Sequence, residues 1–300
     1  MDWIKDIDKD EERAEFLVTA KRKRIWNVEI SLLKELERVC DKYHLRYMAH
    51  YGTLLGAVRH KGYIPWDDDL DIVMPRPDYQ KLLEVGPTEF HAPFFLQSVY
   101  TDANFGMPIA KLRDSRTSAI QYPDFAPEDM NQGIFVDIFP LDCTYDGSEN
   151  SRQLMATAAE VWATVYNAPA IRQALAAGVS SYLSSATLRQ LVDAPREKRM
   201  KTLDDFLLEH YEDTLYLNSF VQTVGQMGQV TYNRQWFETD PAWFPFEETE
   251  IAVPREFYKV LRKCYGPRYF QYIRHASIHK GTIFEPDIPY TEYLTTHKKN

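Results

Sequence analysis

The stretch YGTLLGAVRHKGYIPWDDDLDIVM, residues 51–74, places several carboxylates inside otherwise apolar sequence. The four aspartates are Asp67, Asp68, Asp69 and Asp71. Apolar residues alternate with the last two and Pro75 follows, so residues 70–74 are predicted to form a strand. Side chains alternate along a strand, so we expect Asp69 and Asp71 on one face, with Asp67 if the strand extends that far. Asp68 is expected on the other face and is predicted to be replaceable.

Two carboxylates on one strand face repel each other and resist joint ionisation unless a cation neutralises them. No histidine or cysteine stands beside Asp69 and Asp71, and hard oxygen ligands favour Mg²⁺, with Mn²⁺ as the other choice. The pattern therefore predicts a metal site. The alternative, for a pattern of this kind taken alone, is a solvated acidic turn before a strand.

Gly52-Thr53 stands 16 residues before Asp69, counted from Thr53, between a predicted strand over residues 45–51 and a predicted helix over residues 53–60. A Gly-Thr turn at a helix start offers backbone N–H groups and a hydroxyl to a phosphate. The alternative is that Thr53 only caps its own helix. The turn and the aspartates at this separation are more specific together than either is alone.

The longer string resembles the signature of the LicD family of phosphotransferases, which includes bacterial phosphocholine transferases and the fukutin-related proteins. KLRDSRTSAI (residues 111–120) and GIFVDIFPLD (residues 133–142) resemble that family in the expected order, and so does IAVPREFYKVLRKCYGPRYF (residues 251–270). The resemblance covers residues 30–142 well and residues 236–270 more loosely.

The resemblance implies an α+β fold with a nucleotidyltransferase-like mixed β-sheet core flanked by helices. We expect residues 1–147 to hold this catalytic core with an N-terminal helix, over residues 30–43 by apolar spacing. Residues 148–300 are expected to form a mainly helical region that completes the active-site cleft, with breaks near residues 177–181 and Pro195. The boundary near residue 147 is a composition shift, and a single domain is the alternative.

In such a fold two carboxylates on one strand and a third from a neighbouring strand hold the metal. The pair maps to Asp69 and Asp71, and the third is best matched by Asp137, with Asp67 as a further ligand. Asp71 and Asp137 are both candidates for the general base. The alternative for Asp137 is a buried carboxylate bonded to backbone or to an arginine, and Asp142 is expected to be a turn or cap residue.

Cations and aromatic residues are expected to bind the donor, beside Gly52 and Thr53. The predicted set is Arg59, Lys111, Arg113 and Trp66, with Lys61 and Arg116 as weaker candidates. The alternative for each cation is a solvated charge or a structural ion pair. For Arg113 the partner in such an ion pair would be Asp114 or Asp67. Aromatic residues that could face a quaternary ammonium are Tyr63, Trp66, Tyr122, Trp236, Trp243 and Tyr265, although most such residues belong to a core. His275 and His279 are expected at the surface.

The implied reaction is transfer of a phosphocholine-type group from a CDP-linked donor to a hydroxyl of a glycan or lipid-linked oligosaccharide, as in lipopolysaccharide or teichoic acid synthesis. CDP-choline is the first choice of donor, and CDP-ribitol or CDP-glycerol would use the same core. One alternative is a nucleotidyltransferase that attaches a nucleoside monophosphate and releases pyrophosphate. Another is an inactive nucleotide-binding homologue.

Composition limits the remaining classes. The 300 residues carry a formal net charge of −9, which argues against nucleic-acid binding. Cys40, Cys143 and Cys264 lack zinc spacing and are predicted to be buried free thiols. The charged N-terminus resembles no signal peptide and no apolar run is long enough for a membrane span. We therefore expect a cytoplasmic protein, peripheral at most to the inner face of the membrane through its acceptor.

Overall fold

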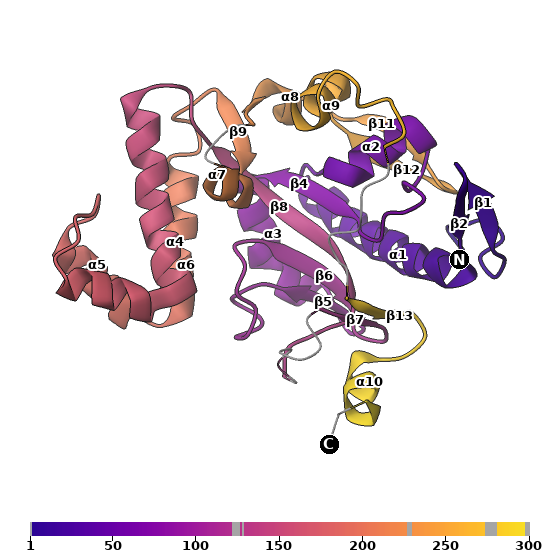
Figure 1. Cartoon of the computed structure of the whole chain (residues 1–300), viewed down its shortest axis with the longest axis horizontal. Coiled ribbons are helices and arrows are strands. Elements are labelled where there is room, and N and C mark those ends of the chain that lie inside the picture. Colours follow the sequence, from indigo (N-terminus) through magenta and orange to yellow (C-terminus); the bar gives the residue numbers. More distant parts are fainter. Residues whose placement is uncertain (1, 122–126, 128, 227–229, 274–280, 298–300) are drawn as a thin grey trace.

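The computed structural model describes residues 2–121, 127, 129–226, 230–273 and 281–297. Its centre is a seven-stranded mixed sheet, in which β10, β9, β8, β4 and β3 lie in this order and β6 and β5 continue from β8 (Figure 1). The strands are β3 (Met48–Ala49), β4 (Asp71–Pro75), β5 (Phe94–Gln97), β6 (Ala110–Asp114), β8 (Ile134–Cys143), β9 (Tyr216–Ser219) and β10 (Tyr232–Asn233). Strand β4 runs parallel to β8, and the other pairings are antiparallel. The α+β class predicted from the sequence is confirmed.

Helices α1 (Ala20–Tyr43) and α3 (Arg76–Glu89) pack on the same side of the sheet, where Figure 1 shows them behind the central strands. The apolar face of α1 and the inward residues of β4 and β8, such as Ile72 and Ile138, form one continuous core. Helix α1 begins ten residues before the predicted start at Ile30, because its first turns carry a basic run that hides the apolar spacing. The sheet core thereby extends to Trp26, while Ile25 packs in a smaller cluster with Ala119, Ile134 and Phe135.

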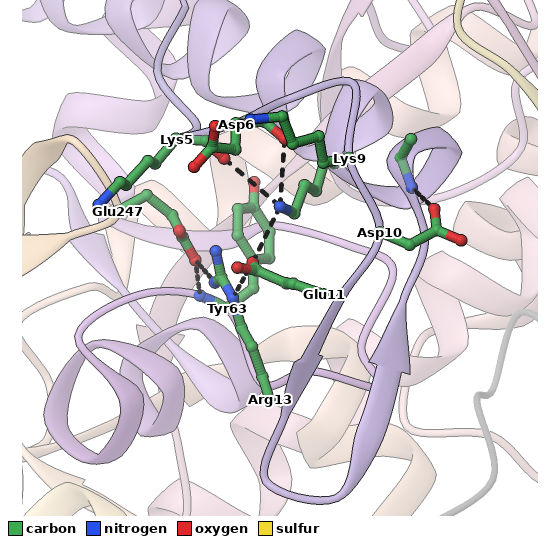
Figure 2. A network of polar contacts seen from close by, with 10 residues as sticks. Lys5, Asp6, Lys9, Asp10, Glu11, Arg13, Tyr63 and Glu247 are labelled. Atoms are coloured by element: carbon green, nitrogen blue, oxygen red, sulfur yellow. Dashed lines mark hydrogen bonds and ion pairs between the residues drawn. The ribbon is translucent and has the colours of Figure 1, made fainter.

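Two hairpins close over the start of the central motif. They are β1 (Glu11–Arg13) with β2 (Phe16–Val18), and β11 (Ala242–Phe246) with β12 (Thr249–Val253). The Arg13 guanidinium lies 2.7 Å from Glu247 Oε1, which also accepts a hydrogen bond from the backbone N–H of Tyr63 (Figure 2). Tyr63 in turn stacks on Trp26 of α1, with ring centroids 4.6 Å apart. Both hairpins, which the sequence analysis did not predict, therefore hold the loop that leads into the aspartates.

Helices α4 (Glu149–Ala176), α5 (Ser185–Asp193) and α6 (Arg196–Glu209) form a separate layer at one end of the sheet (Figure 1). Both predicted breaks, near residues 177–181 and at Pro195, are confirmed. The remaining elements are α2 (Tyr51–His60), β7 (Ser118–Ile120), α7 (Phe220–Gln226), α8 (Gln235–Glu238), α9 (Phe257–Tyr265), β13 (Ile283–Glu285) and α10 (Tyr290–Thr296).

A buried ion-pair network joins the helical layer to the sheet. Arg76 at the start of α3 binds Asp142 of β8 through two hydrogen bonds, of 2.5 and 2.8 Å, and Asp204 of α6 at 2.9 Å. Tyr100 donates a hydrogen bond of 2.6 Å to the other oxygen of Asp204. The prediction that Asp142 is a turn or cap residue is wrong, because β8 continues through it and its carboxylate is needed by Arg76.

Among the described residues, no helix combines the length and the apolar composition that a membrane span requires. Cys40, Cys143 and Cys264 are free thiols as predicted, although Cys264 is only partly buried. Burial raises the pKa of Cys143 to about 12 and that of Cys264 to about 11, so both thiols are protonated at neutral pH.

We expect Arg76→Ala to lower the free energy of unfolding by about 3–5 kcal/mol, because Asp142 and Asp204 would stay buried without their cation. The matched control is Arg152→Ala, which removes an exposed pair with Glu149 and should cost less than about 1 kcal/mol. Chemical denaturation of both variants measures the difference. Equal effects of the two substitutions would contradict a structural role for the network.

Candidate active site: a carboxylate cluster at the start of β4

Three side chains from three adjacent strands meet at the start of β4. Asp71 of β4 is the direct partner of Asp137 in the parallel pairing with β8, and Asp137 is the direct partner of Lys111 in the antiparallel pairing with β6. The Lys111 ammonium lies 2.6 Å from Asp137 Oδ1. All three residues are buried. The alternation predicted from the sequence thus brings Asp137 beside Asp71, because residues paired in register lie on the same face.

The other aspartates lie in the segment that enters β4. The strand begins at Asp71, although the Asp137 N–H donates to the carbonyl of Leu70 and so continues the ladder by one residue. Asp67, Asp68 and Asp69 each offer a carboxylate oxygen within 4.8 Å of the others. The prediction that Asp68 points away is therefore wrong. Strict alternation holds only within a strand, and residues 67–70 lie before it, after a turn at residues 65–66.

Burial and mutual repulsion raise the pKa values of the Asp67, Asp69 and Asp71 carboxyl groups. Burial is the largest cause in each case, and it raises the pKa of Asp67 to about 8 together with the charge of Asp69. The pKa of Asp69 rises to about 7, with Asp137 as the strongest neighbouring charge. The pKa of Asp71 is raised well above its usual range. Lys111 counteracts the shifts of Asp69 and Asp71, while burial lowers its own pKa.

Helix α2 supports the cluster through its first turn. His50 is its N-cap, and the hydroxyl of Thr53 accepts a 2.8 Å hydrogen bond from the backbone N–H of Asp71. The alternative in which Thr53 caps its own helix is therefore wrong. A Cβ on Gly52 would lie 2.3 Å from Asp67 Oδ2, so glycine lets the Asp67 carboxylate approach the helix start. Contact of Gly52 and Thr53 with a phosphate stays a prediction.

Three residues that the sequence analysis missed also hold this region. His50 is fully buried, its backbone N–H donates to the carbonyl of Asp71, and burial lowers its pKa to about 3, so it is neutral. Trp26 and Arg22 of α1 donate to the backbone carbonyl of Asp67 at 3.2 and 2.5 Å. A histidine N-cap is uncommon, and the true start of α1 was not recognised, so no local pattern pointed to them.

Glu29, also on α1, faces the cluster from the core side. It is 1% exposed, and its Oε2 has no hydrogen-bond partner within the described part of the chain. Burial raises the pKa of its carboxyl well above the usual range, the hydrogen bond with Tyr63 opposes this rise, and the charges of Asp69, Asp68 and Asp67 add to it. Its surroundings therefore favour the protonated form of this carboxyl.

Arg113 was predicted to bind the donor, and it lies inside the sheet next to Lys111. Its Nε donates to Gln97 Oε1 at 2.5 Å and another guanidinium nitrogen donates to the carbonyl of Gly133 at 2.6 Å. Burial lowers its pKa to about 10. Pairing with Asp114 or Asp67, the alternative weighed from the sequence, is not found in the described structure, where Asp114 pairs with Arg116 at 2.6 Å.

Arg59 and Trp66 lie toward the far end of α2. The Arg59 guanidinium donates to the backbone carbonyls of Tyr269 and Gln271, at 3.2 and 2.7 Å. Trp66 makes edge contacts with His60 and Phe16. Of the aromatic candidates, Tyr265 is the one whose hydroxyl feels the charges of Asp71, Asp67 and Asp69. These charges add to the rise that burial causes in its pKa. Tyr122, His275 and His279 lie outside the described residues.

Residues 44–165 match the family model described as LicD/FKTN/FKRP, nucleotidyltransferase domain. The chain contains a LicD-family domain. Strands β4, β6 and β8 carry Asp71, Lys111 and Asp137. All three of these side chains therefore lie inside the matched segment. Glu29 lies before the LicD-family domain and Tyr265 after it, so the cluster has neighbours from both flanking parts of the chain.

The chain is similar to lipopolysaccharide cholinephosphotransferase LicD of Haemophilus influenzae, with 34% identity over 127 residues. That alignment covers 42% of this chain and 44% of the Haemophilus protein. Uncharacterized proteins of Rickettsia prowazekii and Rickettsia typhi are 45% and 46% identical over 56 and 55 residues. The chain thus matches less than half of the length of each of these relatives.

We expect Gly52→Ala to have opposite effects in two backgrounds. Alanine favours a helix by about 1 kcal/mol over glycine, but its Cβ would displace the Asp67 carboxylate, at a cost of about 1–3 kcal/mol. The substitution should therefore destabilise the wild-type chain and stabilise the Asp67→Ala variant. A double-mutant cycle by urea denaturation measures this coupling. The same change in both backgrounds would show that Gly52 is not needed for the approach of Asp67.

The metal-free protein is expected to lose stability as the pH rises from about 4 to about 8. Asp67 and Asp69 keep their protons in the folded state up to pH values of about 8 and about 7, while their unfolded forms ionise near pH 4. The folded state thus binds more protons across this window, and the free energy of unfolding falls with pH. Unfolding in EDTA at several pH values measures the slope. Asp69→Asn should make it shallower, and an unchanged slope would contradict the assignment.

Proposed function

We propose that the chain is a metal-dependent LicD-type phosphotransferase that moves a phosphocholine-type group from a CDP-linked donor to a hydroxyl of a glycan. The observation that carries this proposal is the row of Asp71, Asp137 and Lys111 across three strands, with Asp69 beside it. The LicD-family domain and the cholinephosphotransferase of Haemophilus influenzae support the choice of transferred group.

The donor set fits a hard divalent cation. Asp69, Asp71 and Asp137 supply only carboxylate oxygens and are buried together, and the Lys111 ammonium forms an ion pair with Asp137. Oxygen ligands of this kind suit Mg²⁺ or Mn²⁺. We propose that these three residues hold the metal and that Asp67 joins them. When bound, the metal would neutralise negative charge on the phosphoryl oxygens of the donor.

Residues of the chain have distinct tasks in this proposal. Lys111 orients Asp137 through their ion pair and adds positive charge beside the transferred group. Thr53 fixes the backbone of Asp71 through its hydroxyl. We propose Asp71 or Asp137 as the base that accepts the proton of the acceptor hydroxyl. Arg113 shares the strand face of Lys111, and because it donates to Gln97 and Gly133 within the sheet, its role would be structural.

The head group is the least constrained part of the proposal. Tyr265, a residue that is 44% exposed as a whole, lies on α9, and the charges of Asp71, Asp67 and Asp69 act on its buried hydroxyl. The face of a tyrosine ring attracts a quaternary ammonium. This favours CDP-choline over CDP-ribitol or CDP-glycerol, whose head groups carry no cation. For the acceptor we propose a glycan or lipid-linked oligosaccharide of the lipopolysaccharide or teichoic acid kind.

A nucleotidyltransferase is the second candidate, because the matched family model is described as a nucleotidyltransferase domain. It would use the same carboxylates but release pyrophosphate and attach the nucleoside monophosphate. The two reactions differ in their products, so product analysis separates them.

We expect the purified chain to release CMP from CDP-choline in the presence of a glycan acceptor and Mg²⁺. Asp69→Ala and Asp71→Asn should each lower kcat by about 10²–10³-fold, the usual effect of removing one electrostatic contact to the transition state. The matched control is Asp205→Ala, which removes an exposed carboxylate on α6 and should leave kcat unchanged. Chromatography of nucleotides measures CMP, and choline in the glycan product is measured in parallel.

Activity that survives both EDTA and Asp69→Ala would overturn the metal-dependent mechanism. Pyrophosphate release from a nucleoside triphosphate would instead support the nucleotidyltransferase. If no CDP-linked compound reacts, calorimetric titration with CDP-choline and Mg²⁺ shows whether the chain binds this donor, and absence of binding would contradict CDP-choline as the donor.

A further inference from the structure

One stretch of the surface gathers exposed apolar side chains. Among the described residues, fifteen large hydrophobic side chains are exposed, and five of them lie within residues 258–273. These five are Tyr258, Tyr265, Phe270, Tyr272 and Ile273, between 44% and 62% exposed. We call residues 255–273, which comprise α9 and the segment after it, the α9 surface. Clustering of this kind marks an interaction site more often than single exposed residues do.

The same surface is basic, although the chain as a whole is acidic. It contains five cations and one acid, a formal charge of +4 (5 − 1), against −9 for the chain. The cations are Arg255, Lys259, Arg262, Lys263 and Arg268. Lys259 pairs with Glu256, the single acid, at 2.8 Å. Within the described ranges of the chain, Arg262, Lys263 and Arg268 have no carboxylate within 4.0 Å, so their charges face outward.

The α9 surface is built on the fold and is not a loose tail. Val260 and Leu261 of α9 are buried in the main core, and the helix packs against α2 (Figure 1). Tyr258, Arg262 and Tyr265 therefore recur on one outward side of the helix, at spacings of four and three residues.

The segment after α9 is fixed to the end of α2. Arg59 binds the backbone carbonyls of Tyr269 and Gln271, and the Tyr272 ring stacks on His60 with centroids 4.8 Å apart. These bonds leave Phe270 and Ile273 exposed on a backbone that is itself held in place. The aromatic and basic groups thus keep a fixed arrangement before any partner binds.

We propose that the α9 surface docks the protein on a bilayer that contains anionic lipids. Tyrosine and phenylalanine partition into the boundary between headgroups and acyl chains, and lysine and arginine beside them pair with anionic headgroups. The remainder of the chain carries a formal net charge of −13 (−9 − 4), so anionic headgroups repel the rest of the chain as a whole and attract the α9 surface. A folded acidic partner would pair with the cations of the α9 surface. It would not offer an apolar medium to the exposed aromatic side chains beside them.

Docking would also place the carboxylate cluster near the lipid surface. Tyr265 belongs to the α9 surface, and the charges of Asp71, Asp67 and Asp69 act on its hydroxyl. An acceptor carried by a lipid would then meet the cluster without leaving the membrane. This consequence rests on the proposed function, whereas the docking itself does not.

The test is cosedimentation of the full chain with vesicles of phosphatidylcholine alone or mixed with phosphatidylglycerol. We expect binding to the anionic vesicles that weakens as NaCl is raised, and little binding to the neutral ones. Arg262→Gln with Lys263→Gln should weaken binding about thirtyfold, and Phe270→Ser with Ile273→Ser should weaken it at least tenfold. Neither donor nor metal is present, so a failure of the proposed transferase activity would leave this result unaffected.

Two control variants change the same residue types elsewhere. Arg189→Gln with Lys198→Gln, on α5 and α6, removes two exposed cations, and Tyr166→Ser with Val179→Ser removes two exposed apolar side chains. Both should bind like the wild type, and melting curves show that every variant is folded. Equal binding by wild type and the α9 variants, or no binding to either vesicle, would overturn the proposal. Binding to a lipid-free oligosaccharide but not to vesicles would overturn it in favour of a saccharide surface.

Discussion

The repulsion among buried carboxylates at the start of β4 is the constraint around which the rest of the molecule is organised. Asp71 and Asp137 are paired in register on parallel strands, so the sheet itself forces their side chains together. Asp69 lies beside them, and one buried ammonium, that of Lys111, pairs with Asp137. Burial raises the pKa values of Asp69 and Asp71, which favours the neutral form of both carboxyl groups. Binding of a cation, as proposed above, would relieve the same repulsion.

The surrounding elements hold the cluster by its backbone. Thr53 bonds to the N–H of Asp71, His50 to its carbonyl, and Trp26 to the carbonyl of Asp67. Two hairpins far apart in sequence meet at Glu247 and Tyr63 to hold the loop before the aspartates. These contacts are made to the backbone of Asp67 and Asp71, not to their carboxylates. A site made in this way is preorganised, because the groups that fix its backbone are separate from those that would bind the metal.

Local pattern predicted the elements of the site better than its contacts. Period-two alternation was enough to bring Asp71 and Asp137 to one face, and the Gly-Thr turn was rightly expected at the start of a helix. Alternation failed at Asp68, because the residues before β4 are not in a strand. It also could not show that Asp142 binds Arg76, or that Arg113 is bonded within the sheet, because those partners lie on other elements.

The sequence by itself determined the α+β class, the aspartate motif, the break points of the helical layer and the resemblance to a LicD-family domain. These depend on short-range periodicity and on a motif of adjacent residues, both of which can be read along one chain. Only the tertiary structure decided that Glu29 faces the aspartates, that two hairpins hold the entry loop, and that the residues after α9 form a basic aromatic surface. Some of those features join residues that are 234 positions apart, such as Arg13 and Glu247. Which of these distant residues meet depends on the faces that the packed sheet and helices leave open.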